Sequence, residues 1–92
     1  MTQLQQISAE ALRQKLIDLG YWDKIHNGKL LEKVQRTTPA NITPGGISQI
    51  ISYWDEHLHY LCTIHRVVTK DGQMIHEDVK DAFIDGVRYW SV

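Results

Sequence analysis

The sequence contains only one cysteine, Cys62, among its 92 residues. An internal disulfide is therefore impossible, although chains this short often depend on such a crosslink. Stability has to come from side-chain packing, from a ligand, or from association with another chain. We therefore expect a homo-oligomer or a complex with a protein partner, and no cofactor.

Long hydrophobic stretches are also missing. The polar segment from Met1 to Gln6 has no basic region followed by an apolar one, and so does not resemble a secretory signal. No apolar stretch approaches the length that is needed to cross a membrane. We expect a cytoplasmic protein without a membrane segment.

Neither sign of charge dominates, because ten Lys and Arg stand against eleven Asp and Glu, and the formal net charge is −1. The second half of the chain, 46–92, is acidic, with four basic and seven acidic residues. Proteins that neutralise nucleic acid phosphates normally carry a clustered basic face. A nucleic acid partner is therefore not expected.

The motifs of several enzyme classes are absent as well. The sequence has no Gly-rich phosphate loop and no G-x-S-x-G nucleophile motif. Cys62 has no sequence context that would activate its thiol, and it is better explained as a small buried residue. These absences leave few recognised routes to catalysis.

The residues that are present have the composition of an ordinary globular protein, with 42% hydrophobic and 23% charged residues. A chain of this length is too short to divide into two cores, so residues 1–92 are expected to form a single domain. Ser8 is a suitable N-cap for a helix whose apolar face carries Leu12 and Leu16, and Gly20 is a suitable C-terminal stop.

The next elements are indicated by a change in pattern. Leu30, Leu31 and Val34 predict a short second helix, so the helical half covers about residues 8–36. Pro39, Pro44 and two glycines predict a loop over 37–46. Beyond it, β-branched and aromatic residues alternate with polar ones and predict antiparallel hairpins over about 47–92. The fold class is therefore α+β, with one or two N-terminal helices packed on a C-terminal antiparallel sheet of three to four strands.

The Asp71-Gly72 pair predicts a two-residue hairpin turn. In that register Lys70 pairs with Gln73 and Val68 with Ile75, while Arg66 lies opposite Glu77 and His65 opposite Asp78. A three-residue loop would instead place Val68 against Met74 and turn an acid toward the core. Asp85-Gly86 predicts a second hairpin, although the spacing within 77–85 also permits a helix.

Four of the five histidines lie on the predicted hairpins. The preferred register brings His65, His76 and Asp78 into one cross-strand neighbourhood, where they could transfer protons as in metal-independent ribonucleases. Arg66 would then stabilise phosphate charge. His57 and His59 share a strand face but supply only two ligands, so no metal site is predicted. Exposed strand faces also need polar residues for solubility alone, and this explanation is preferred.

The aromatic residues favour a different function. Tyr and Trp are typical anchors of protein interfaces, and Tyr53, Trp54, Tyr89 and Trp90 are the candidate binding residues. We therefore expect a small accessory domain that self-associates or binds another protein and has no catalytic activity. The alternative is a ribonuclease-like enzyme that uses His65, His76, Asp78 and Arg66.

Overall fold

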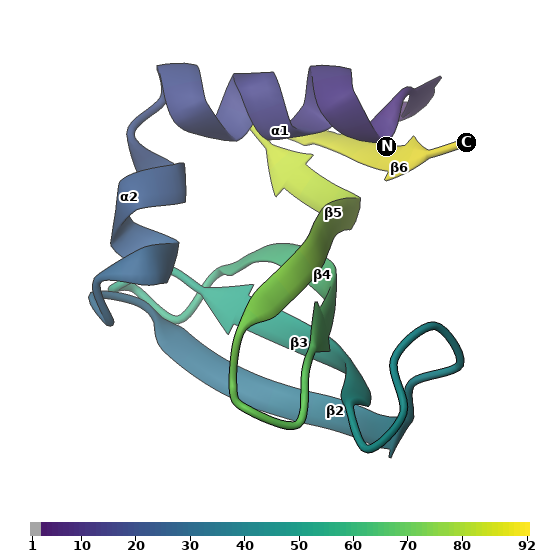
Figure 1. Cartoon of the computed structure of the whole chain (residues 1–92). Coiled ribbons are helices and arrows are strands. Elements are labelled where there is room, and N and C mark those ends of the chain that lie inside the picture. The colour runs from purple at the N-terminus through teal and green to yellow at the C-terminus, as the bar shows by residue number, and fades with distance from the viewer. Residues whose placement is uncertain (1–2) are drawn as a thin grey trace.

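A computed structural model describes residues 3–92 and shows an α+β fold, as the sequence predicts (Figure 1). Two short helices accompany one six-stranded sheet. No helix among residues 3–92 is long and apolar enough to span a membrane. In chain order the elements are β1 (Gln3–Ile7), α1 (Ala9–Asp18), α2 (Tyr21–His26), β2 (Leu31–Pro39), β3 (Ile47–Trp54), β4 (Tyr60–Val68), β5 (Met74–Ile84) and β6 (Val87–Ser91).

The strand order across the sheet is β1-β6-β5-β4-β3-β2. Neighbours from β2 to β6 are antiparallel, while β1 runs parallel to β6, so the two ends of the chain lie close together (Figure 1). The expected count of three to four strands is therefore too low. The two additional strands, β1 and β2, lie at the two edges of the sheet.

Helix α1 has the start and the end that its sequence predicts. The Ser8 hydroxyl accepts a hydrogen bond of 3.1 Å from the backbone N–H of Ala11. Gly20 follows with a φ of 81°, in the left-handed region that stops a helix. The helix buries Leu12 and Leu16 completely.

The second helix is not where the sequence analysis puts it. Helix α2 covers Tyr21–His26, and the segment Leu31–Pro39, which was expected to be a helix and then a loop, forms strand β2. The connecting loop therefore begins only after Pro39. All residues of β2 are exposed, so no alternating apolar pattern marks it as a strand, and its conformation comes from pairing with β3.

The two faces of the sheet have different environments. One face, which we call the core face, carries Ile51, Tyr53, Ile64 and Val79. These residues pack with residues of α1 and α2 in a single buried cluster. The residues that alternate with these form the outer face, which includes Ser48, Ser52, Thr63, His65, Asp78 and Asp81. The segment 77–85, for which a helix was the competing interpretation, is part of strand β5.

The predicted register of the β4–β5 hairpin is confirmed away from the turn. Ile64 lies opposite Val79, His65 opposite Asp78 and Arg66 opposite Glu77. At the turn the prediction is wrong, because Thr69 N–H donates to the Gln73 carbonyl and Val68 pairs with Met74. The loop therefore has three residues, and a bulge at Ile75 restores the expected register.

Candidate functional site

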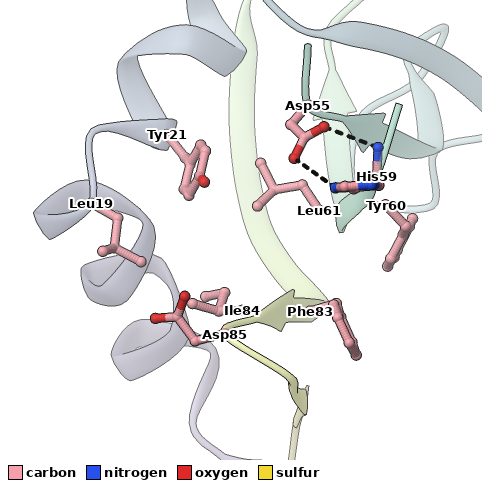
Figure 2. Close-up of a pocket in the computed structure, with 9 residues that line it drawn as sticks. All are labelled: Leu19, Tyr21, Asp55, His59, Tyr60, Leu61, Phe83, Ile84 and Asp85. Atoms are coloured by element: carbon pink, nitrogen blue, oxygen red, sulfur yellow. Dashed lines mark hydrogen bonds and ion pairs between the residues drawn. The ribbon is translucent and has the colours of Figure 1, made fainter. Parts of the chain in front are cut away.

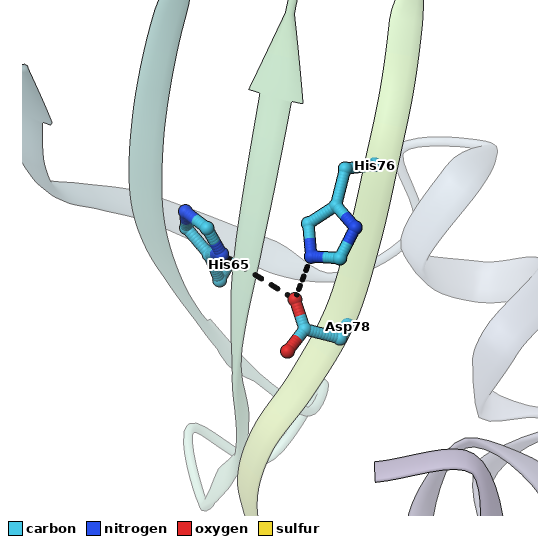
Figure 3. A group of neighbouring side chains, drawn as sticks. All are labelled: His65, His76 and Asp78. Carbon is cyan, nitrogen blue, oxygen red and sulfur yellow. Dashed lines mark ion pairs between the residues drawn. The ribbon is translucent and has the colours of Figure 1, made fainter. Parts of the chain in front are cut away.

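His65, His76 and Asp78 converge on the outer face, although they come from two strands (Figure 3). The shared point is the Asp78 Oδ1 atom, which lies 3.4 Å from His65 Nδ1 and 2.7 Å from His76 Nε2. The two imidazole rings meet at a steep angle, with centroids 5.4 Å apart. The cross-strand neighbourhood that the register predicts is thus present as a compact three-residue cluster.

Ser48 extends this cluster onto strand β3. Its hydroxyl lies 2.7 Å from His65 Nε2, so the His65 ring bridges Ser48 on one side and Asp78 on the other. The sequence analysis missed Ser48, because its position depends on the register between β3 and β4. That register includes an irregularity near Trp54, and the sequence carries no turn motif that fixes it.

The carboxylate of Asp78 lacks part of the hydrogen bonding that a buried carboxylate normally has. Its Oδ1 atom is buried and accepts no well-aligned hydrogen bond, although His76 Nε2 lies 2.7 Å from it. The Oδ2 atom lies 3.5 Å from the ammonium group of Lys80. Buried carboxylate oxygens are normally hydrogen-bonded, so this atom requires an explanation.

Arg66 does not belong to this cluster. It alternates with His65 along β4 and projects from the core face, where its guanidinium contacts Glu77 at 2.6 Å and Tyr53 at 3.2 Å. Arg66 therefore cannot supply the cation that the ribonuclease-like alternative assigned to it, and the cation next to the cluster is Lys80.

A second polar group lies further along the outer face. Ser52 and Thr63 are bonded at 2.8 Å, and the Tyr60 hydroxyl bonds to Thr63 and Asp81. Burial and the bond to Asp81 raise the pKa of Tyr60, so its hydroxyl stays protonated at neutral pH. These contacts explain how polar side chains are accommodated on a partly buried strand face.

Cys62 lies in the core, as its sequence context indicates. Burial raises the pKa of its thiol to about 12, so the reactive thiolate is not populated at neutral pH. A nucleophilic role for this residue is therefore inconsistent with its surroundings.

The four candidate binding aromatics divide between the two faces. Tyr53 is only 1% exposed and belongs to the core, and Tyr89 packs against that core from β6. Trp54 and Trp90 are on the outer face, with 37% of Trp90 exposed. Tyr53 is therefore the one of these four aromatics that is fully buried, while Trp54 and Tyr89 are half-buried and Trp90 is exposed.

Trp54 belongs to an apolar surface that the sequence analysis did not assemble. A shallow hollow of about 550 Å³ at one end of the outer face contains Trp54, Leu58, Tyr60, Phe83 and Arg88, and we call this surface the aromatic end. The Trp54 and Tyr60 rings meet edge to face at 5.8 Å, and the Arg88 guanidinium lies 5.6 Å from the centre of the Tyr60 ring.

Leu58 reaches this surface from the turn between β3 and β4. It has a φ of 62° and is 69% exposed, an unusual combination for a large apolar residue. The Asp55 carboxylate fixes the turn by accepting bonds of 2.9 Å from the backbone N–H groups of His57 and His59. This bonding lowers the pKa of Asp55, led by the bond from His59.

A neighbouring pocket of about 440 Å³ lies between the α1–α2 connection and the ends of β4 and β5 (Figure 2). Leu61 and Ile84 line it together with Tyr21, and the carboxylates of Asp55 and Asp85 are at its margin. It shares Tyr60 and Phe83 with the aromatic end. Asp55 is already occupied by the turn, so the pocket offers few free polar groups for a ligand.

His57 and His59 do not join the cluster at Asp78. They lie in the β3–β4 turn, with ring centroids 6.2 Å apart and both side chains highly exposed. Among residues 3–92 they belong to no group of three potential metal ligands.

Comparisons with known proteins give no match to a family model, to a curated protein or to a solved structure. Functional inference therefore depends on the geometry of the two outer-face sites.

Proposed function

We propose that this protein is a small cytoplasmic binding module that self-associates through the aromatic end of its sheet. The supporting observation is Leu58, which is held in solvent at a positive φ beside Trp54, Tyr60 and Phe83. Tyr, Trp and Arg are the side chains that most often anchor protein interfaces, and this surface contains all three types.

The backbone conformation of Leu58 lowers the stability of the monomer, and this loss supports a binding role. A non-glycine residue in the left-handed region loses about 1–2 kcal/mol of stability, and glycine would avoid this loss. A large exposed apolar side chain also gains nothing from burial within the monomer. Both disadvantages are offset if the side chain is buried against a second copy, because two copies present the same surface to each other.

The outer face does not favour the ribonuclease-like alternative. Its predicted cation, Arg66, projects from the opposite face of the sheet and is bound to Glu77. The acidic second half of the chain would also repel an RNA substrate.

The test replaces Leu58 with glycine. We expect Leu58→Gly to raise the free energy of unfolding of the monomer by about 1 kcal/mol, because it relieves the left-handed conformation. The same change should weaken self-association at least tenfold. Denaturant unfolding of dilute protein measures the first quantity, and sedimentation equilibrium measures the second.

Ile42→Ser is the matched control, since Ile42 is equally exposed but lies in the loop at the other end of β3. This variant should associate like the wild type. A wild type that remains monomeric at 100 micromolar would contradict the proposal, as would unchanged association of Leu58→Gly.

A further inference from the structure

We propose that His65, His76 and Asp78 form a binding site for a divalent transition metal ion. The site lies on the outer face, on different residues from those of the aromatic end, so it does not depend on self-association. Each residue contributes one ligand atom, and these atoms all lie within 4.8 Å of one another.

The spacing of the ligand atoms fits a small ion. Ligands at about 2.0–2.2 Å from Zn²⁺ in a tetrahedral site are separated by about 3.4 Å. His65 Nδ1 and Asp78 Oδ1 are already 3.4 Å apart. His76 Nε2 is closer to the carboxylate, at 2.7 Å, and its half-exposed side chain is free to move back by the small distance required.

The hydroxyl of Ser48 orients one of the ligands. When the N–H at His65 Nε2 donates to this hydroxyl, the Nδ1 atom carries a lone pair that is directed toward Asp78. A lone pair and a carboxylate oxygen repel each other unless a cation lies between them. Histidines that bind metals commonly donate their second ring N–H to a neighbouring oxygen, and Ser48 supplies that oxygen here.

The buried Oδ1 atom of Asp78 lies between the two imidazole rings, 2.7 Å from His76 Nε2 and 3.4 Å from His65 Nδ1 (Figure 3). A bound cation would satisfy this oxygen without any change in the backbone. Lys80 contacts the other carboxylate oxygen, Oδ2, which leaves Oδ1 as the oxygen that would bind the ion.

The ligand types select the class of ion. Two imidazole nitrogens and one carboxylate oxygen suit Zn²⁺ and neighbouring transition metals, whereas Ca²⁺ and Mg²⁺ prefer sites made of oxygen atoms. Three protein ligands leave the fourth tetrahedral position open for water or for an external ligand.

The experiment titrates the full chain, prepared without a histidine tag, with Zn²⁺ and with Co²⁺. We expect calorimetry to show one ion bound per chain. Bound Co²⁺ should show the absorption bands of a four-coordinate ion, and these bands should disappear when Zn²⁺ displaces it. His65→Gln, His76→Gln and Asp78→Asn should each weaken binding at least tenfold. Ser48→Ala should weaken it about tenfold or more while leaving the stoichiometry unchanged.

The double variant His57→Gln/His59→Gln is the matched control, because it removes two histidines outside the site. It should bind Zn²⁺ like the wild type. The proposal is overturned if this control abolishes binding, if the wild type binds no Zn²⁺ at 100 micromolar, or if folded His76→Gln binds normally. Circular dichroism establishes that each variant is folded.

Discussion

Arg66 and Glu77 face each other across β4 and β5, with both side chains mostly buried on the core face. The Arg66 guanidinium bonds to Glu77 through both Nε and an amino nitrogen, at 2.7 and 2.6 Å. His26 of α2 lies 2.8 Å from the other carboxylate oxygen. One glutamate therefore connects the sheet to a helix.

We expect Glu77→Gln to lower the free energy of unfolding by about 2–4 kcal/mol. The change keeps the side-chain volume but leaves the Arg66 charge without its partner, and removing one member of a buried ion pair is strongly destabilising. Urea unfolding at pH 7 measures the effect. Glu56→Gln is the control at an exposed turn position and should change stability by less than about 0.5 kcal/mol. Equal stabilities of the two variants would contradict the prediction.

Alkaline pH is expected to destabilise the protein through Tyr53. Burial, followed by the hydrogen bond to Glu32, raises the pKa of Tyr53 to about 12, whereas an unfolded tyrosine titrates near 10. The folded chain therefore holds this proton at a pH where the unfolded chain has lost it. The contribution of Tyr53 to the free energy of unfolding is therefore fully present below pH 10 and should be lost as the pH rises toward 12.

Denaturant unfolding from pH 8 to 12, with tyrosinate absorbance recorded in parallel, measures this loss. Tyr53→Phe should show a shallower decline with pH, even though it also loses the bond to Glu32. A wild type with constant stability up to pH 11.5 would be inconsistent with the raised pKa.

Much of the histidine cluster was predictable at the residue scale. The pairing of His65 with Asp78 was predicted from a two-residue turn at Asp71-Gly72. The loop has three residues, and the pairing is still observed because the bulge at Ile75 compensates for the longer loop. Ser48 was not predictable, because it comes from a third strand. Leu58 was not predictable either, because its positive φ depends on bonds that Asp55 makes within the turn.

The helices and strands differ in how far their own residues predict their structure. Helix α1 has a capping serine, an apolar face and a terminal glycine within one short segment, so its sequence predicts it well. Strand β2 has no such signals. It is exposed on both faces and carries Lys33, Arg36 and a terminal Pro39, features that suit an edge strand and discourage pairing with other chains.

The loop before β3 contains a position that only glycine fits. A Cβ atom added to Gly46 would lie 2.5 Å from the Thr43 methyl group and 2.6 Å from the Val68 carbonyl oxygen. The carbonyl belongs to strand β4 and cannot move without disturbing the sheet. Gly46→Ala should therefore lower the free energy of unfolding by about 1–3 kcal/mol.

Thermal and denaturant unfolding of Gly46→Ala measure this cost. Gly20→Asn is the comparison, because a Cβ atom there meets nothing within 4 Å and asparagine tolerates the left-handed conformation. It should cost less than about 1 kcal/mol. A smaller loss of stability for Gly46→Ala than for Gly20→Asn would contradict the prediction, because it would mean that the loop can shift to accommodate the added Cβ atom.

The whole molecule is elongated, with principal extents of 43, 27 and 22 Å. The helices contribute Leu12, Leu16 and Ile25 to the core, and β2 at the far edge contributes no buried residue. The sequence predicts the α+β class because the period of the apolar pattern changes along the chain. It does not predict the size of the sheet, since β1 is polar and pairs only with the distant strand β6.

The pairing of β1 with β6 also means that the sheet is completed late in synthesis of the chain. Strand β6 follows the other described elements in chain order, so until it has been synthesised β1 lacks its neighbour and the edge of β5 at residues 81–84 stays open. An open strand edge on a nascent chain invites pairing with other nascent chains. The part of β5 that β6 later covers begins with Asp81, and a charged residue at this position disfavours pairing with another chain while the edge is open.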